Sequence, residues 1–379
     1  MTTSRRTRKI RALAVIGTRP EVIKMAPVIG ELRRRRARFS VTTVLTGQHR
    51  EMVRPYLSLF GIRPDHDLAI MQRAQTLDGI VERILRRLPA VLKDVRPDIV
   101  LVQGDTTSAF AAALAAFHQQ IAVGHVEAGL RTNNKYNPFP EEMSRRLIGR
   151  VADLHFAPTA FARRSLLREA VAPSNVFVTG NTVIDALQSI ARRRYEFTDP
   201  VLAAIPYSRR RVICVTTHRR ESFGPPMRNT LKALRRIAER YPDVEIVLPV
   251  HYNPSVRQEV YRLLSGIERI HLVEPLGYEA FVHLLKRCYL VLTDSGGVQE
   301  EAPSLGKPVL VLRETTERPE GIRAGTAMLV GTNAERIVKA TAALLDNPRA
   351  YRAMAQAVNP YGDGRAGKRI AAILESRFG

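Results

Sequence analysis

The stretch Ile99-Val100-Leu101-Val102-Gln103-Gly104-Asp105-Thr106-Thr107 is an apolar run followed by a polar turn, and it leads into the apolar segment Ala109–Phe117. A short apolar run bounded by a turn is typical of a strand that is buried on both faces of a sheet. The apolar segment is about half the length that a membrane span needs, so we expect a buried core helix there. A strand, a turn and a helix in this order indicate a parallel α/β sheet.

Similar units recur along the chain. Helical patterns such as Leu77–Leu92, Asn229–Arg240 and Tyr278–Lys286 lie between successive strands. The strands form two series, which predict two doubly wound α/β domains. We expect the boundary between them in the basic, irregular stretch Ser189–Arg211. A final helix is expected at Gly367–Phe378. The first series of strands is Leu13–Ile16, Val41–Leu45, Ile99–Val102, Ala122–Val126, Leu154–Ala157 and Val176–Val178, and the second is Val212–Thr216, Glu245–Val250, Ile270–Val273, Leu290–Thr293 and Val309–Leu312.

Composition narrows the class of protein. The 379 residues carry a formal net charge of +23. Nucleic-acid binding would call for basic residues interleaved with stacking aromatics, which the sequence lacks. We therefore assign most of the charge to solvated helix faces such as Arg33–Arg36, Arg192–Arg194 and Arg209–Arg211.

Cys214 and Cys288 are expected to be buried, reduced thiols. With no apolar run long enough to cross a bilayer, a cytoplasmic location is expected.

Motifs for common cofactors are missing from the sequence. No G-x-G-x-x-G follows a strand, and there is neither a Walker A sequence nor a His/Cys cluster with zinc spacing. Asp65-His66-Asp67 has a DxD pattern, but it follows the loop-like Gly61–Pro64, so we do not expect a metal there. The sequence therefore predicts neither a cofactor nor a metal.

Carboxylates follow the strands of the first predicted domain. Asp105 comes after Ile99–Val102, Glu127 after Ala122–Val126, and Glu141 and Glu142 open a helix. Asp105 could simply cap a helix, and the paired glutamates could simply complement a helix dipole. Because ligands of parallel sheets bind beyond the carboxyl ends of the strands, several acids there favour acid–base chemistry.

Groups suited to bind an anion follow the strands of the second predicted domain. Ser295-Gly296-Gly297 opens a helix after Leu290–Thr293, which presents backbone N–H groups to a phosphate, although an ordinary tight turn would look the same. His251 and Arg318 follow neighbouring strands, and Glu301 could accept hydrogen bonds from ribose hydroxyls. In the first domain, Arg19 and Lys24 could also reach a diphosphate.

Longer motifs identify a family. Gly17–Glu21, Thr46–Met52, Gly104–Thr107, His125–Arg131 and Pro140–Glu142 resemble, in order, those of bacterial non-hydrolysing UDP-N-acetylglucosamine 2-epimerases. The resemblance continues through Thr179–Asp185, His218–Ser222, Pro249–His251, Asp294–Pro308, Thr315–Glu320 and Asn359–Gly364.

The resemblance implies a glycosyltransferase-B-type fold of two Rossmann-like domains facing a cleft. Residues 1–188, with a C-terminal helix at 362–379, would form the sugar-side domain, and residues 189–361 would bind UDP. It also implies a homodimer and a second, activating substrate molecule. The residues matched to the family's catalytic groups are Asp105, Glu127, Glu141 and His218; those matched to its UDP contacts are Arg19, Lys24, His251, Phe281, Ser295, Gly296, Gly297, Glu301, Arg313 and Arg318; and those matched to its activating site are Gln48, His49, Gln75, Arg131 and Arg219.

The expected reaction is the reversible C2 epimerisation of UDP-N-acetylglucosamine to UDP-N-acetylmannosamine. Without a nicotinamide site, elimination of UDP to a glycal is favoured over oxidation at C3, and two acid–base groups on opposite faces of the sugar are needed. The alternatives are a 2-epimerase of a related UDP-acetamido sugar and a UDP-sugar-dependent glycosyltransferase, which would have no need of three acids around C2.

Overall fold

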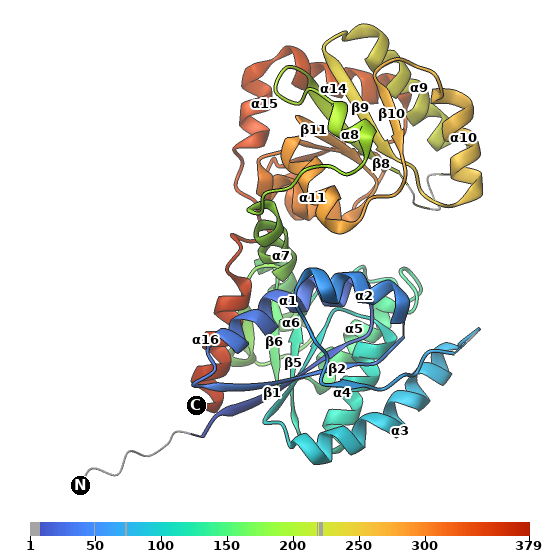
Figure 1. Cartoon of the computed structure of the whole chain (residues 1–379). Coiled ribbons are helices and arrows are strands. Elements are labelled where there is room, and N and C mark those ends of the chain that lie inside the picture. The colour runs from blue at the N-terminus through green and yellow to red at the C-terminus, as the bar shows by residue number, and fades with distance from the viewer. Residues whose placement is uncertain (1–7, 49, 73, 218, 220–222) are drawn as a thin grey trace. The chain divides into compact units, whose positions relative to one another are not determined.

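The computed structural model describes residues 8–48, 50–72, 74–217, 219 and 223–379. The chain divides into two compact units, one formed by Met1–Ala186 with Tyr361–Gly379 and the other by Leu187–Pro360. Each unit is a parallel sheet with helices on its faces (Figure 1).

The first unit contains a seven-stranded sheet in the order β3-β2-β1-β4-β5-β6-β7, with parallel pairing throughout. The strand order reverses between β1 and β4, and in doubly wound sheets such a switch point marks the place where ligands bind. The strands are β1 (Ile10–Ile16), β2 (Phe39–Leu45), β3 (His66–Asp67), β4 (Ile99–Gln103), β5 (Ala122–Val126), β6 (Leu154–Ala157) and β7 (Val176–Val178).

Both faces of this sheet are buried. In β1, Ala12, Ala14 and Ile16 pack into one hydrophobic cluster, while Leu13 and Val15 pack into another on the opposite face, as the alternation of side chains along a strand requires. The helices of the unit are α1 (Arg19–Arg34), α2 (Arg50–Leu59), α3 (Leu77–Val95), α4 (Thr107–His118), α5 (Glu141–Val151), α6 (Ala160–Arg168), α7 (Thr182–Ala191, which continues into the second unit) and α16 (Ala366–Phe378), with a 3₁₀ turn at Pro173–Asn175.

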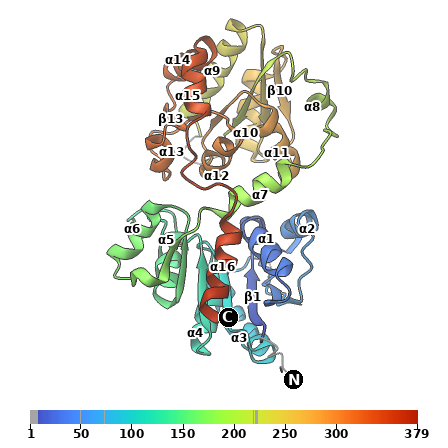
Figure 2. The same cartoon turned by 90° about the vertical axis from the view of Figure 1, so that its left-hand side faces the viewer.

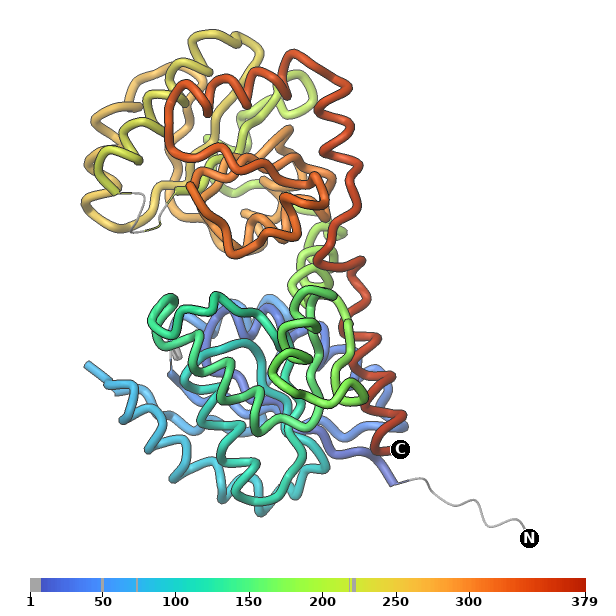
Figure 3. The backbone as a smooth tube through the Cα atoms, turned by 180° about the vertical axis from the view of Figure 1, so that it is seen from behind, coloured from blue at the N-terminus to red at the C-terminus, as the bar shows by residue number. Residues whose placement is uncertain are grey.

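The C-terminal helix α16 packs against α1 in the first unit (Figures 2 and 3). A Cβ on Gly367 would lie 2.9 Å from the carbonyl oxygen of Pro27, so glycine is needed where the two helices approach. The carboxylate of Asp185 accepts hydrogen bonds from the first amides of α16, at 3.1 Å from Ala366 N and 2.9 Å from Gly367 N. These contacts fix the last segment of the chain on the first unit.

The second unit contains a six-stranded sheet in the order β10-β9-β8-β11-β12-β13, again with parallel pairing. The same reversal occurs between β8 and β11. The strands are β8 (Arg211–Thr216), β9 (Val244–Pro249), β10 (Ile270–Val273), β11 (Leu290–Thr293), β12 (Val309–Val311) and β13 (Ala327–Leu329). The helices are α8 (Pro200–Ala204), α9 (Pro225–Arg240), α10 (Pro254–Leu264), α11 (Tyr278–Arg287), α12 (Gly296–Glu301), α13 (Pro319–Arg323), α14 (Ala334–Asp346) and α15 (Pro348–Ala355), with a 3₁₀ turn at Ala302–Leu305.

The predicted α/β class is confirmed, and each of the predicted strands is present with bounds that differ by at most a few residues. Two edge strands, β3 and β13, were not predicted, because they have only two and three residues. The stretch Ser189–Arg211 is not irregular throughout, since it includes the end of α7 and the whole of α8. Both cysteines are buried free thiols. Among the helices of the described residues, none has the length and apolarity that a membrane span needs.

Glu21 fixes the turn between β1 and α1. Its buried carboxylate accepts hydrogen bonds from Gly17 N (3.1 Å), Thr18 N (2.5 Å) and Thr106 Oγ1 (2.9 Å). Burial raises the pKa of Glu21 from 4.5 to about 7, because desolvation outweighs these hydrogen bonds. The folded chain therefore keeps a proton that the unfolded chain releases as the pH rises from about 4.5 to 7.

This pKa predicts the sign of one contribution to stability. Since the folded state binds more protons in that interval, the free energy of unfolding of wild type should fall relative to Glu21→Gln as the pH rises from 4.5 to 7, by up to about 3 kcal/mol. Urea unfolding of both proteins across this range measures the difference. Glu82→Gln, on an exposed glutamate of α3, is the control and should show no such trend. Parallel pH curves for wild type and Glu21→Gln would contradict the raised pKa.

Candidate active site

The turn after β5 holds Glu127 in an unusual backbone conformation. Its φ angle is +66°, which non-glycine residues seldom adopt, and Gly129 two residues on has φ +92°. A Cβ on Gly129 would lie 2.3 Å from the carbonyl oxygen of Ala162, so the turn has no room for a larger residue there. Left-handed conformations of this kind collect at functional sites, where the surrounding structure holds them in place.

The carboxylate of Glu127 is buried among hydrogen-bond donors. Lys24 Nζ lies 2.6 Å from both Oε1 and Oε2. Gln103 Nε2 donates to Oε2 at 2.5 Å, and Asn181 Nδ2 donates to Oε1 at 2.9 Å. The four residues come from α1, the end of β4, the turn after β5 and the segment after β7. The carboxyl edge of the sheet therefore brings together residues that are far apart in the sequence.

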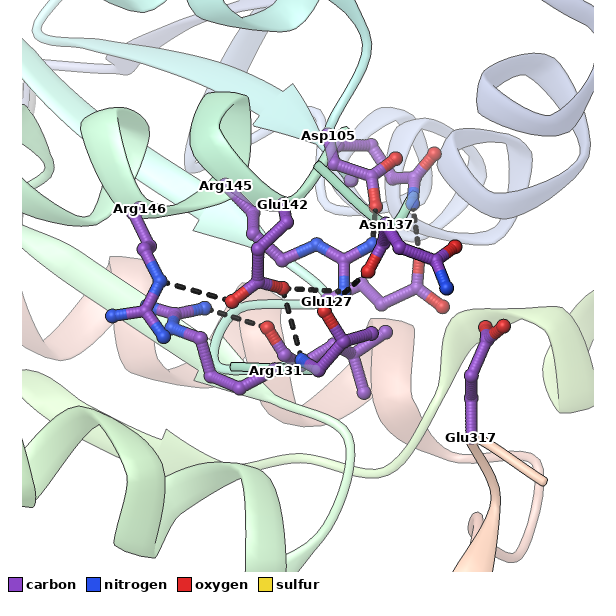
Figure 4. A network of polar contacts seen from close by, with 12 residues as sticks. Asp105, Glu127, Arg131, Asn137, Glu142, Arg145, Arg146 and Glu317 are labelled. Carbon is purple, nitrogen blue, oxygen red and sulfur yellow. Dashed lines mark hydrogen bonds and ion pairs between the residues drawn. The ribbon is translucent and has the colours of Figure 1, made fainter. Parts of the chain in front are cut away.

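Asp105 lies beside this cluster at the end of β4. Thr106, not Asp105, caps α4, since its Oγ1 accepts from Ala109 N at 3.0 Å. The carboxylate of Asp105 instead accepts from Arg145 at 2.5 Å (Figure 4). Burial and the charge of Glu127 raise the pKa of Asp105, and the opposing effect of Arg145 does not cancel them. The side chain is 28% exposed, so it remains accessible to a ligand.

The preceding turn residue, Gly104, has φ +72°, and its carbonyl oxygen lies 2.7 Å from Nε2 of the buried His125. Burial lowers the pKa of His125 to about 3, so the ring is neutral near pH 7 and can donate one N–H to that carbonyl. Strand β5, which leads into the turn of Glu127, thereby fixes the turn that carries Asp105.

The two glutamates at the start of α5 differ in their surroundings. Glu142 is fully buried and accepts from Thr132 N (2.9 Å), Asn133 N (3.3 Å) and Arg146 Nε (2.9 Å) (Figure 4). Burial acts to raise the pKa of Glu142, but these hydrogen bonds and the nearby arginines outweigh it and hold the pKa below its usual range. Glu142 is therefore a structural anion. Glu141, the predicted catalytic residue, is half-buried at the first position of the helix.

Two of the residues predicted to bind an activating substrate are in contact. Gln75 Nε2 donates to the Gln48 carbonyl oxygen at 3.1 Å, and Ser108 Oγ donates to Gln48 Oε1 at 2.6 Å. Arg131 makes a bidentate pair with Glu169, at 2.8 Å for each contact, and its side chain is only 3% exposed. His49 lies outside the described residues. An activating role for these residues stays a prediction.

In the second unit, the Ser295–Gly297 turn lies at the end of β11. Ser295 N donates to Thr293 Oγ1 at 2.9 Å, and Ser295 is the N-cap of α12. Beside it, the buried carboxylate of Asp294 accepts from Thr217 Oγ1 (3.2 Å) and Arg219 N (3.0 Å). Asp294 therefore joins the turn after β8 to the turn after β11. His218, which lies between its two partners in the sequence, is outside the described residues.

Side chains around α12 are held by hydrogen bonds. Tyr278 Oη donates to Glu301 Oε1 at 2.9 Å. Arg318 Nε donates to the buried Glu300, and Arg313 Nη2 lies 3.6 Å from Glu317 Oε1. The arginine side chains are 15% and 11% exposed, respectively, so both are largely covered. The helix thus anchors the segment after β12 that carries both arginines.

The remaining predicted UDP contacts are less enclosed. His251 is exposed after β9, and its Nδ1 accepts from Asn253 N at 3.1 Å. Phe281 is half-buried on α11 against the core. In the first unit, Arg19 is exposed at the start of α1, with its guanidinium 5.8 Å from the centre of the Tyr56 ring. Binding of UDP by these residues stays a prediction.

Metal ligation was not predicted, and within the described ranges there is no group of three or more His, Cys, Asp and Glu side chains that could hold a metal ion. In the DxD segment, Asp65 accepts from Thr43 N at 2.6 Å, and Asp67 accepts from Ala69 N at 2.9 Å. Both carboxylates therefore have a local structural role.

Three side chains of the site were not predicted from the sequence: Gln103, Asn181 and Arg145. Gln103 ends β4 and Asn181 follows β7, so applying the strand-end argument to amides as well as acids would have found them. Arg145 is four residues after Glu141, and nothing in the sequence indicates that it contacts Asp105.

The chain is similar to known enzymes over nearly its whole length. Residues 31–375 match the family model described as UDP-N-acetylglucosamine 2-epimerase. The chain is 52% identical over 372 residues to the UDP-N-acetylglucosamine 2-epimerase of Bacillus subtilis, covering 98% of this chain and 97% of the relative. It is 49% identical over 380 residues to the Escherichia coli enzyme of that name, covering 97% of this chain and 99% of the relative.

Solved structures give the same result. The Neisseria meningitidis UDP-GlcNAc 2-epimerase bound to UDP-GlcNAc has a TM-score of 0.86 and 46% identity, over 97% of this chain and all of that one (100%). At 14% identity and a TM-score of 0.64, the glycotransferase of kitacinnamycin shares only the fold, which confirms the predicted glycosyltransferase type of architecture. The chain belongs to the UDP-N-acetylglucosamine 2-epimerase family.

Proposed function

We propose that the chain catalyses the reversible C2 epimerisation of UDP-N-acetylglucosamine to UDP-N-acetylmannosamine by elimination and re-addition of UDP. The observation that carries this proposal is the pair of acids Asp105 and Glu127, each held by a cation, beside the switch point of the first sheet. A related structure, from Neisseria meningitidis, contains UDP-GlcNAc.

The chemistry explains why two acids are needed. In the forward half-reaction the C1–O bond breaks, and its electron pair leaves with the diphosphate. The electrons of the C2–H bond form the C1=C2 double bond of a glycal, and the proton passes to a carboxylate. UDP then returns to C1 while an acid protonates C2 on the opposite face. The atoms balance without an external oxidant, and the sugar regains its bond to UDP with C2 inverted.

The surroundings of the two acids suit different roles. Burial raises the pKa of Asp105, which favours a role for it as the acid that delivers a proton to C2. Glu127 is surrounded by donors that stabilise its anionic form, which suits a base. Glu141, one helical turn before Arg145 on α5, would supply a third carboxylate. His218, outside the described residues, would stabilise the leaving group or the sugar.

The UDP half of the substrate would be bound by Ser295–Gly297, Glu301, Arg313 and Arg318, with His251, Phe281, Arg19 and Lys24. Free backbone N–H groups and cations stabilise the charge that grows on a leaving diphosphate. A glycosyltransferase would share such ligands, but the likeness to one is a likeness of fold alone. A homodimer remains part of the proposal.

A proton NMR time course with UDP-N-acetylglucosamine in deuterium oxide, without an acceptor, tests this function. We expect UDP-N-acetylmannosamine to accumulate towards an equilibrium mixture with deuterium at C2, because the carboxylates exchange their protons with solvent. Accumulation of free UDP and N-acetylmannosamine would indicate hydrolysis instead. Epimerised product that kept the original C2 proton would contradict the proposed exchange of that proton with solvent.

Substitutions should separate proton transfer from UDP binding. Glu127→Gln keeps the size of the side chain but cannot shuttle a proton, so turnover should fall by roughly 10²–10⁴ while UDP affinity stays within a few-fold. Arg318→Ala removes a cation proposed to bind UDP, so affinity should fall about ten-fold or more. Calorimetry with UDP beside steady-state kinetics measures both effects.

The control for these variants is Arg352→Ala, on an exposed arginine of α15 in the second unit. It removes the same charge as Arg318→Ala and should change neither quantity. If Glu127→Gln lost UDP binding while keeping turnover at saturation, the proposed division of roles would be wrong.

Activation by a second substrate molecule is the last part of the proposal. It rests on the family resemblance and on the contact between Gln48 and Gln75. Initial velocity should depend on substrate concentration sigmoidally, and Gln75→Ala or Arg219→Ala should weaken the sigmoidal response or abolish activity. A hyperbolic curve for wild type would rule out this activation.

A further inference from the structure

Each oxygen of the Glu127 carboxylate accepts from two donors. Oε1 accepts from Lys24 at 2.6 Å and from Asn181 at 2.9 Å, while Oε2 accepts from Lys24 at 2.6 Å and from Gln103 at 2.5 Å. An ionised carboxylate has about four acceptor sites in all. The proposed base is therefore saturated with donors, and one donor must withdraw before it can accept a proton from carbon.

The two amide donors are fixed in place. Asn181 Oδ1 accepts from Val183 N at 3.1 Å, which orients the amide so that Nδ2 faces Glu127. The backbone N of Asn181 donates to the Tyr361 carbonyl oxygen at 2.7 Å. Gln103 is the last residue of β4, and both residues are only 2% exposed. Neither amide can leave without breaking buried contacts.

Lys24 differs from the two amides in three ways. It is charged, and its ammonium is carried on a flexible four-carbon stem. Its side chain is 19% exposed, whereas both amide residues are buried. An ammonium group binds phosphate as a point charge, whereas a neutral amide gains much less from an anion. An arriving diphosphate would therefore attract Lys24 away from the carboxylate and leave the amides where they are.

We propose that Lys24 masks the base Glu127 in the unliganded enzyme, that the substrate's diphosphate withdraws it, and that Gln103 and Asn181 then hold the unmasked carboxylate in position. This inference rests on the proposed elimination route. The base becomes available only when the leaving group is present, so proton abstraction from C2 is coupled to correct binding of UDP. Gln103 and Asn181 are positioning residues, because they act through Glu127.

A crystal structure of the full chain with UDP tests the withdrawal directly. We expect Lys24 Nζ to lie more than about 4 Å from both Glu127 oxygens and within hydrogen-bonding distance of a phosphate oxygen, while the contacts from Gln103 and Asn181 persist. Bound UDP with Lys24 still on both oxygens would overturn the inference and leave the proposed function intact. Failure of UDP to bind in calorimetry would instead contradict the proposed function.

A kinetic test uses Lys24→Arg. A guanidinium can still bind phosphate, but its planar fork grips a carboxylate with two parallel hydrogen bonds, so the mask should be harder to remove. We expect kcat to fall at least about ten-fold while UDP affinity stays within a few-fold. The control is Lys93→Arg, on an exposed lysine of α3. Unchanged kcat in Lys24→Arg would contradict the masking role.

The positioning role is tested by Asn181→Asp, which keeps an acceptor for Val183 N but turns the donor to Glu127 into an acceptor. We expect kcat to fall by about 10–100-fold with UDP affinity within a few-fold of wild type. Asn175→Asp adds the same charge elsewhere in the first unit and is the control.

Gln103→Met removes the other amide donor and should show the same split, with a lower kcat and little change in UDP affinity. Gln103→His, which keeps an N–H, should restore part of kcat. Equal kcat for the Met and His variants would overturn this role.

Discussion

The ion pair between Lys24 and Glu127 is the contact on which the organisation of the site depends. A carboxylate that is almost fully buried would be costly to ionise without compensating groups. Lys24 and two amides provide that compensation from three separate elements of the first unit. The left-handed backbone of Glu127 directs its side chain toward those donors, and the glycines around it leave space for the turn. The donors that stabilise the Glu127 anion also occupy its acceptor sites. One donor must therefore move before Glu127 can act as a base.

The architecture was predictable because buried parallel strands are apolar along their whole length. Each such strand ends in a polar turn. The turns at the carboxyl edges of the two sheets carry Asp105, Glu127 and Ser295–Gly297. The short edge strands β3 and β13 escaped prediction, since two or three residues carry no periodic signal. The acids of the site were predictable, and the same strand-end argument points to Gln103 and Asn181, but it does not give their contacts with Glu127. Which donor reaches Glu127 depends on the order of strands in the sheet, and the sequence alone does not give that order.

The high positive charge has more than one structural origin. The clusters Arg192–Arg194 and Arg209–Arg211 are mostly exposed, as predicted, but they follow α7 and lead into β8 and do not lie on helix faces. Other arginines are buried and paired: Arg145 contacts Asp105 and Glu142, and Arg131 contacts Glu169. In these places a guanidinium fixes the orientation of a carboxylate near the proposed site. A part of the charge therefore supports the arrangement of the acids and does not only solvate the surface.

The central claim is that the bond between C1 and the diphosphate breaks during each epimerisation. It can be tested with UDP-N-acetylglucosamine that carries oxygen-18 in the atom joining C1 to the β-phosphorus, followed by phosphorus NMR of the recovered substrate. If UDP is released within the site, its β-phosphate can rotate before it returns to C1. The label should then move into the non-bridging positions at a rate comparable to epimerisation. A label that stays in the bridging position after epimerisation has reached equilibrium would contradict the elimination route.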